Sequence, residues 1–194
     1  QFIDDKPEDG ALWLHVLRSP HAHAKIVSID TATAASMADV VTVYTGADLQ
    51  ADGVKPIPNS ADFRRAGGKP TATPPHHALA LDTVRYVGEA VAAVIAASAH
   101  EARDAAEAIV VEYTPLPAVV DAVAATTPGA PSLVPEAPDN IACEMHHGDR
   151  AAARAAFARA AHVVALDLVN QRVAPNPIEP RVAIPIPPHA VQSI

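Results

Sequence analysis

The sequence predicts a mixed helix-and-strand domain, of the α+β or α/β class, followed by the beginning of a second domain. An apolar run from Ala90 to Ala97, bounded by turn and cap signals, is typical of a strand buried on both faces. Apolar residues at helical spacing follow this run, and a second β-forming stretch follows the helix. The last fifty residues contain too few expected elements to close a core of their own.

The helix of this central unit, which spans residues 84–121, has its start signals in place. Ser98 fits an N-cap, and Glu101, three residues on, is the residue that a capping box requires. One face of the predicted helix would carry Ala102, Ala105, Ala106 and Ile109. Gly88 predicts a turn before the buried strand, and prolines end the second strand, residues 110–113. The pattern alone favours a well-formed core over a site.

Shorter elements are expected before the central unit. Strands are predicted at residues 11–17, 25–29, 40–44 and 78–81. A short alanine-rich helix is expected at 31–38, and a turn begins at Thr45 or Asp48. From 51 to 75 the composition changes to Pro, Gly, Asn, Asp and Lys without periodicity. A loop this long inside a compact domain is usually functional or mobile.

Beyond the central unit, residues 122–140 are rich in Pro, Ala and Thr and predict an extended linker. Asp149 can cap a helix over 150–161. The core-facing side of that helix would carry Ala153, Ala156, Phe157 and Ala160. A strand is predicted at 162–170, with Val164, Leu166 and Leu168 on one face. An edge strand is expected at 181–186, because Pro185 interrupts it.

Composition excludes several classes of protein. A formal net charge of −8 argues against a nucleic-acid binder, which would usually show a basic face. No apolar stretch reaches the roughly 18 residues that a membrane span needs. The single cysteine provides no disulfide framework, and the acidic start lacks the regions of a signal peptide. We therefore expect a cytoplasmic protein with neither nucleic acid nor membrane as a partner, and sequence missing before Gln1.

Histidines are the most conspicuous candidates for a metal site. His21 and His23 form an HxH motif, which on a strand would place both rings on one face. Pro20 makes this stretch a turn instead, and nothing sets the spacing of a third or fourth ligand. The pairs at 76–77 and 146–147 are no better placed. Turn or surface histidines are favoured, and a histidine metal-binding protein is a weaker alternative.

Other candidates for chemistry also have plainer interpretations. Cys143 could be a nucleophile, but no local motif supports this and an inert thiol is favoured. Gly67–Gly68 lacks the spacing of a phosphate-binding loop. Glu89 could present a carboxylate near a ligand, although pairing with a nearby cation or water is favoured. Glu179, between prolines, fits a rigid crossover near a site or a plain connection equally well. The residues alone give no catalytic, cofactor-binding or metal-binding assignment.

Five phrases, in family order, resemble the large, molybdopterin-binding subunit of the molybdenum hydroxylases. This family includes xanthine dehydrogenase, aldehyde oxidase and aerobic carbon monoxide dehydrogenase, and its bacterial three-subunit branch looks nearest. The phrases are LRSPHAHAKIVSID (17–30), VVTVYTGADL (40–49), VRYVGEAVAAVIA (84–96), VEYTPLPAVVD (111–121) and LVNQRVAPNPIEPR (168–181). The family usually has Pro where this chain has Ala90.

The resemblance implies an α/β hammerhead domain at residues 1–125, an extended linker at 126–144 and the incomplete start of a molybdenum cofactor-binding domain at 145–194. Family members hydroxylate a carbon or oxidise carbon monoxide, and electrons pass from molybdenum through iron–sulfur clusters to flavin. Implied for the full-length family are a molybdenum–molybdopterin cytosine dinucleotide cofactor and iron–sulfur and FAD subunits as partners. The family's glycine-rich loop and catalytic glutamate would lie beyond Ile194, so this chain alone is expected to bind no cofactor and not to turn over.

Two functions follow as expectations. The chain is part of a hydroxylase large subunit that scaffolds the molybdopterin domain, or it is a truncated, non-catalytic remnant that at most binds a partner subunit. Its tail passes from Ile184 through prolines directly to His189, where the family has a further hairpin with a molybdenum-side glutamine. Gln192 belongs to the phrase after that hairpin and does not take this role. An internal deletion is therefore expected.

Overall fold

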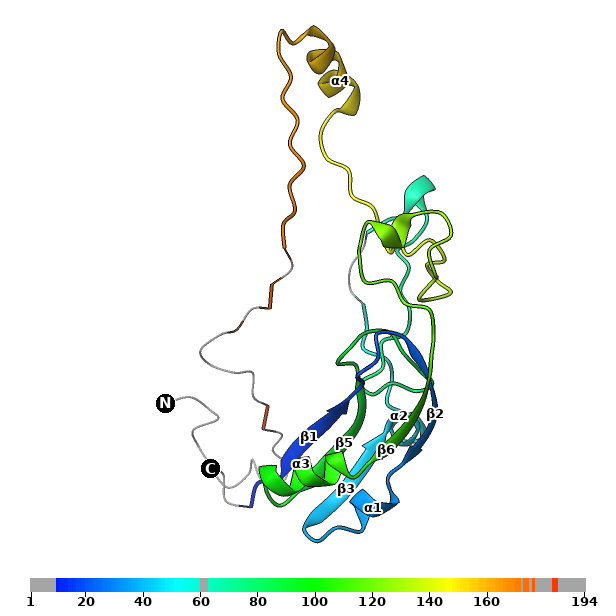
Figure 1. Ribbon diagram of the computed structural model, residues 1–194, viewed down its shortest axis with the longest axis vertical. Helices are drawn as coiled ribbons and strands as arrows, with labels where there is room; N and C mark the ends of the chain where they lie inside the picture. Colours follow the sequence, from blue (N-terminus) through cyan, green and yellow to red (C-terminus); the bar gives the residue numbers. More distant parts are fainter. Residues whose placement is uncertain (1–9, 60–62, 172, 175, 177–182, 185–194) are drawn as a thin grey trace. The chain divides into compact units, whose positions relative to one another are not determined.

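The computed structural model describes residues 10–59, 63–171, 173, 174, 176, 183 and 184. Residues 12–147 form the larger of two compact units (Figure 1). The smaller unit combines residues 1–11 with residues 148–194. Within the described residues, no helix is both long enough and apolar enough to cross a membrane.

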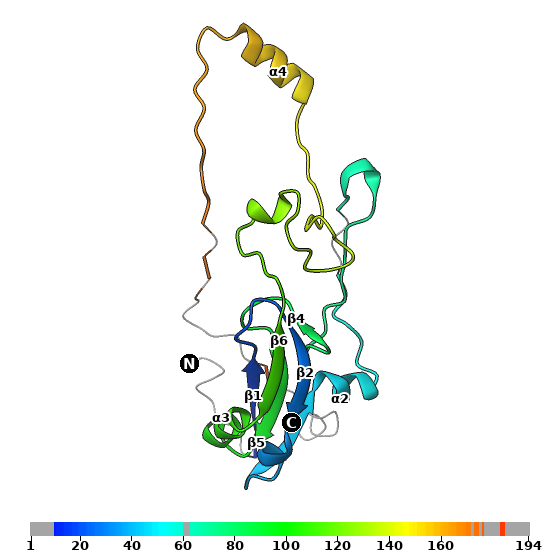
Figure 2. The same ribbon diagram turned by 45° about the vertical axis from the view of Figure 1, so that its right-hand side comes forward.

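The described residues of the larger unit form two antiparallel sheets of three strands each (Figure 2). The strand order in the first sheet is β1 (Trp13–Arg18), β5 (Ala90–Ala96) and β3 (Val40–Thr45). The order in the second is β4 (Thr83–Val84), β2 (Ala24–Asp30) and β6 (Val110–Pro115). Successive strands along the chain therefore belong alternately to one sheet and the other.

Helix α3 (Ala99–Glu107) packs on β5 through small side chains. The buried cluster at this contact contains Ala34, Ala92, Val94, Ala105, Ala106 and Ile109. This confirms the predicted buried strand and the predicted buried face of the helix. Ser98 accepts a hydrogen bond from the backbone N–H of Glu101, which confirms the N-cap. Glu101 Oε2 is buried without a hydrogen-bond partner, so that oxygen does not complete a capping box.

A second apolar cluster joins the two sheets. It contains Ala24, Ile26, Ala80, Val84 and Val91. Val91 lies on β5 of the first sheet, whereas Ala24 and Ile26 lie on β2 of the second. Because β5 contributes to both clusters, its two faces are buried against different neighbours, as the unbroken apolar run predicted.

Two expectations for the region between β3 and β5 were wrong. The turn predicted at Thr45 or Asp48 is helix α2 (Gly46–Ala51), and these two residues form its reciprocal capping box. Residues 78–81 are not a strand, and the short strand here is β4. The earlier helix is confirmed as α1 (Ala32–Ala35).

Gly46 has no room for a side chain, because a Cβ there would lie 2.3 Å from the Ala80 carbonyl oxygen.

The smaller unit contains helix α4 (Arg150–Arg159), and Asp149 caps it by accepting the Ala152 backbone N–H. The expectation that this helix buries an apolar face was wrong, because Phe157 is 63% exposed. The predicted strand at 162–170 is extended without strand pairing, since a strand requires a hydrogen-bonded neighbour and the described residues supply none. Glu179, Gln192 and all but two residues of the predicted strand at 181–186 lie outside the described residues.

Candidate functional site

Two turns that are distant in sequence are hydrogen-bonded together at the ends of β1 and β5. The Ser19 N–H donates to the Glu89 carbonyl, and the Gly88 N–H donates to the Ser19 carbonyl, both at 2.8 Å. Arg18 Nη1 donates to the Gly88 carbonyl, also at 2.8 Å. Gly88 has a φ of +90°, a value that favours glycine and confirms the predicted turn. The phrases LRSPHAHA and VRYVGE are therefore parts of one local structure.

Glu89 stabilises the second of these turns from within. Its Oε2 accepts the backbone N–H of Arg85, four residues earlier. The partner is thus a backbone amide rather than the cation or water that the sequence favoured. A carboxylate that accepts a backbone N–H in this way stabilises the turn. Oε2 is therefore already engaged in a hydrogen bond within the protein.

Glu89 also lines an open groove of about 220 Å³. The groove's charged side chains are Asp82, Glu89 and Glu136, opposed by Arg85. Arg85 Nη1 donates to the Thr83 carbonyl at 3.2 Å, and Arg85 Nε is buried without a hydrogen-bond partner. Carboxylates therefore outnumber cations along the groove. This lining disfavours phosphate or another anionic group, which needs backbone N–H donors or cations.

The two histidines of the HxH motif have separate structural contacts. His23 is buried, and its Nδ1 lies 2.7 Å from the Pro117 carbonyl oxygen. The ring of His21 lies beside that of Tyr113, with centroids 4.7 Å apart. Burial raises the pKa of the Tyr113 hydroxyl, and a hydrogen bond with Ser19 partly offsets the rise. Both histidines thus hold the predicted turn against the end of β6.

The remaining candidates are not brought together into a site. Across the described residues, no three His, Cys, Asp or Glu side chains are placed to hold a metal ion. Cys143 is exposed. His147 Nε2 lies 2.9 Å from the sulfur of Met145, and both residues are exposed. Gly67 and Gly68 have φ values of +72° and +75° and form a tight turn, which explains these glycines without a ligand.

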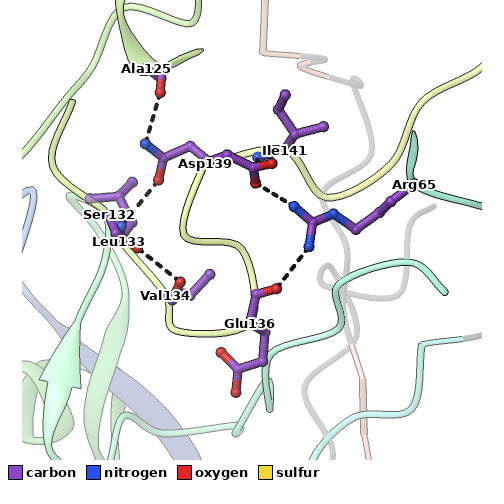
Figure 3. A network of polar contacts seen from close by, with 9 residues as sticks. Arg65, Ala125, Ser132, Leu133, Val134, Glu136, Asp139 and Ile141 are labelled. Carbon is purple, nitrogen blue, oxygen red and sulfur yellow. Dashed lines mark hydrogen bonds and ion pairs between the residues drawn. The ribbon is translucent and has the colours of Figure 1, made fainter. Parts of the chain in front are cut away.

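Two residues that the sequence did not single out, Arg65 and Asn140, organise the long loops. Figure 3 shows Arg65 pointing toward Asp139 and Glu136. Arg65 Nη2 pairs with the Asp139 carboxylate, and its Nη1 donates to the Glu136 carbonyl at 3.3 Å. Asn140 donates to the carbonyls of Ala125 and Pro131, and its side-chain oxygen accepts the Leu133 N–H. Asn140 has a φ of +57°, which asparagine tolerates better than most residues. Its place after Pro138 and Asp139 was an available turn signal.

The fold and these turns define an α+β domain, and comparison with known families identifies it. Residues 1–117 match the family model described as "Aldehyde oxidase and xanthine dehydrogenase, a/b hammerhead domain". The chain belongs to this family. The match confirms the family and the hammerhead fold that the sequence predicted.

Individual relatives extend the similarity beyond the matched domain. The carbon monoxide dehydrogenase large chain of Afipia carboxidovorans is 34% identical over 191 residues, which cover 92% of this chain and 22% of the relative. The nicotine 6-hydroxylase large subunit of Paenarthrobacter nicotinovorans is 35% identical over 185 residues, covering 93% and 21%. The crystal structure of a Cu,Mo-CO dehydrogenase in its carbon monoxide reduced state superposes with a TM-score of 0.65 at 32% identity, covering 84% and 20%. This chain therefore spans about a fifth of the length of these relatives.

Proposed function

We propose that this chain is the hammerhead part of the large subunit of a molybdenum-dependent hydroxylase. It scaffolds the molybdenum-binding part and performs no chemistry itself. The observation that carries this proposal is the similarity to large chains of such enzymes over more than nine-tenths of the sequence. We also propose domain boundaries at 1–125, 126–144 and 145–194, and the family match to residues 1–117 supports the first of them.

The cofactor in this proposal is molybdenum–molybdopterin, in its cytosine dinucleotide form, held by polypeptide outside this chain. The described groove does not fit such a group, because Asp82, Glu89 and Glu136 would repel the phosphates of a dinucleotide. Arg85 contributes the opposing charge, but one of its nitrogens already donates to a backbone carbonyl. The chain's own contribution is therefore to hold the shape of the surrounding protein.

The partners in this proposal are an iron–sulfur subunit and an FAD subunit, assembled in the cytoplasm. The names of several relatives support an assembly of more than one chain, since they include a "large chain", a "large subunit" and a "dehydrogenase complex subunit gamma". The relatives' names differ in substrate, so the similarity favours no single substrate for this chain. We therefore assign no substrate to this chain.

A truncated, non-catalytic remnant that at most binds a partner subunit is the second candidate. The observation that favours it is the segment 163–169 of the smaller unit. Its large apolar side chains, Val163, Val164, Leu166, Leu168 and Val169, are all exposed. An apolar segment in this state gains no stability from burial.

Purification of the tagged chain from cells that express it naturally distinguishes the two candidates. The preparation would be analysed for molybdenum and iron by elemental analysis and for flavin by absorbance. The first candidate predicts all three in near-stoichiometric amounts, contributed by co-purifying polypeptide. Their complete absence, with the chain folded and abundant, would reject it in favour of the remnant.

A further inference from the structure

We propose that the described parts of residues 54–75 and 120–147, here called the loop layer, form the docking surface for the molybdenum-binding part of the large subunit. This inference rests on the proposed function and identifies the surface through which the scaffold acts. The occupant is the polypeptide that corresponds to the remaining four-fifths of the relatives.

The loop layer has a fixed backbone although it contains little regular secondary structure. The Glu144 N–H donates to the Arg64 carbonyl at 2.8 Å, and the Ala72 N–H donates to the Ala142 carbonyl at 2.9 Å. These bonds join the two loops near residues 142 and 144, and Arg65 joins them again through Glu136 and Asp139 (Figure 3). Asn140 holds the second loop together by its hydrogen bonds to Ala125, Pro131 and Leu133. Ordering so many loop residues costs conformational entropy, which the polar contacts offset.

This ordered backbone presents large apolar side chains to solvent. They are Val54, Ile57, Phe63, Val120, Val123 and Met145. Val120 is 88% exposed and Val123 is 75% exposed. Loops run over the protein surface, and apolar side chains exposed along several stretches of one hydrogen-bonded layer favour an interaction site there. The side chains are already positioned, so docking would cost little further ordering.

Chain length and connectivity decide which occupant this surface fits. The relatives are about five times as long as the region that they share with this chain. The chain leaves the loop layer at His147, so polypeptide that continues the large subunit is tethered beside this surface. Tethering raises the effective concentration of an attached partner well above that of a free subunit or a second copy. The molybdenum-binding part is therefore the occupant that the layer favours.

Another exposed surface of the larger unit provides a matched control. The solvent side of the β2–β6 pair exposes Val27 and Val110 to about the same extent as the more buried members of the loop layer. These valines lie among Asp30, Glu112 and Ser28, and Ser28 donates to the Glu112 carboxylate at 3.0 Å. Isolated apolar side chains among polar neighbours are ordinary surface.

The test is co-expression of the tagged 194-residue chain with the part of the Afipia carboxidovorans carbon monoxide dehydrogenase large chain that it does not cover. Co-purification and binding affinity would be measured for the unaltered chain and for three variants. Val120→Ser with Val123→Ser removes apolar area from the layer, and Asn140→Ala loosens its backbone. Val27→Ser with Val110→Ser is the control. Circular dichroism and the melting temperature would establish that each variant folds.

We expect the unaltered chain to co-purify, the Val120/Val123 variant to bind at least about tenfold more weakly, and the control to bind normally. Asn140→Ala should also weaken binding, because the surface is no longer held in shape. Undiminished binding by the folded Val120/Val123 variant, or equal loss in the control, would overturn the docking surface while leaving the proposed function intact. Failure of the unaltered chain to bind would reject both.

Discussion

The larger unit contains two regions that are ordered by different forces. Around β5 and α3, fully buried alanines and valines pack a helix closely against a sheet. In the loop layer, by contrast, the side chain of Arg65 and backbone hydrogen bonds join two long irregular segments, and Asn140 holds the second segment together. The first region derives its stability from apolar burial, whereas the second depends on a few polar contacts near solvent.

This difference indicates which of the two regions tolerates amino-acid substitutions. A close-packed interior transmits every change of volume to its neighbours, so its sequence is tightly constrained. A loop layer held at a few polar points tolerates changes elsewhere but fails at those points. We therefore expect substitutions in the two regions to differ both in magnitude and in how far their effects spread.

The largest effect is expected at Val94, which is completely buried at the centre of β5. Val94→Asp places an unpaired charge in the core and should cost more than about 4 kcal/mol of unfolding free energy. Val41→Asp, at an exposed position on β3, should cost no more than about 0.5 kcal/mol. Urea denaturation measures both. Similar losses at the two positions would contradict an interior centred on β5.

Gly46→Ala should have the next largest effect. The added methyl would overlap the backbone carbonyl of Ala80, which cannot move without disturbing the buried cluster around Val84. We expect a loss of about 2 kcal/mol in thermal or chemical unfolding. Ala47→Ser, at the exposed neighbouring position, is the control and should be nearly neutral. Full stability in Gly46→Ala would show that α2 is not held tightly against residues 79 and 80.

Asn140→Ala tests the loop layer directly. Removal of the side chain leaves the Leu133 N–H and the carbonyls of Ala125 and Pro131 without these partners. Amide hydrogen exchange in residues 131–142 should accelerate about tenfold or more, because each lost bond of this kind is worth roughly 1 kcal/mol. The amides of β5 should keep their protection. If β5 loses protection equally, the two regions are one cooperative unit and the contrast fails.

The smallest effect is expected at Asp48, in the capping box of α2. Hydrogen bonds from Thr45, first from its side chain and then from its backbone, lower the pKa of the Asp48 carboxyl. Because the folded pKa lies below the unfolded one, the stabilisation is present at neutral pH and is lost as pH falls through the folded value. Asp48→Asn should therefore be slightly less stable than the unaltered chain near pH 7. The difference should fade as pH falls below the ordinary pKa of an aspartate and through the lowered folded value, as measured by melting temperature.

A pH-independent difference between these two proteins would show that Asp48 does not act through its charge. The control is Asp52→Asn, which alters a carboxylate at the other end of the same helix. Its stability should not follow the same curve, because Asp52 is the C-cap and forms no reciprocal box with Thr45.

The sequence predicted the elements whose signals are local. The apolar run of β5, the Ser98 cap and the spacing of alanines in α3 all depend on residues within a few positions of each other. The family and the hammerhead fold were also predicted, through phrases that extend across the chain. The capping box of α2 was equally local, but a helix of six residues is too short to show a clear period.

What the sequence could not supply depends on distant partners. Arg65 and Asp139 are 74 residues apart, and no pattern within either loop indicates the other. The strand expected at 162–170 had the right alternation but finds no hydrogen-bonded neighbour among the described residues. Alternation shows that a segment can form a strand, whereas pairing requires a second segment. Phe157 was likewise assigned to a core from its spacing along the helix alone. Spacing does not supply the neighbouring segment that a buried face needs, and in the smaller unit Phe157 is exposed.

The alternation of successive strands between the two sheets has a consequence for synthesis on the ribosome. The central strand of the first sheet, β5, is made after both of its partners. The central strand of the second sheet, β2, is made early but cannot pair with β6 until residues 110–115 have been made. In neither sheet do two strands follow each other directly along the chain, so both sheets depend on pairing between distant segments. We expect the emerging polypeptide to stay unfolded until β6 has left the ribosome, and then to fold late and as a whole.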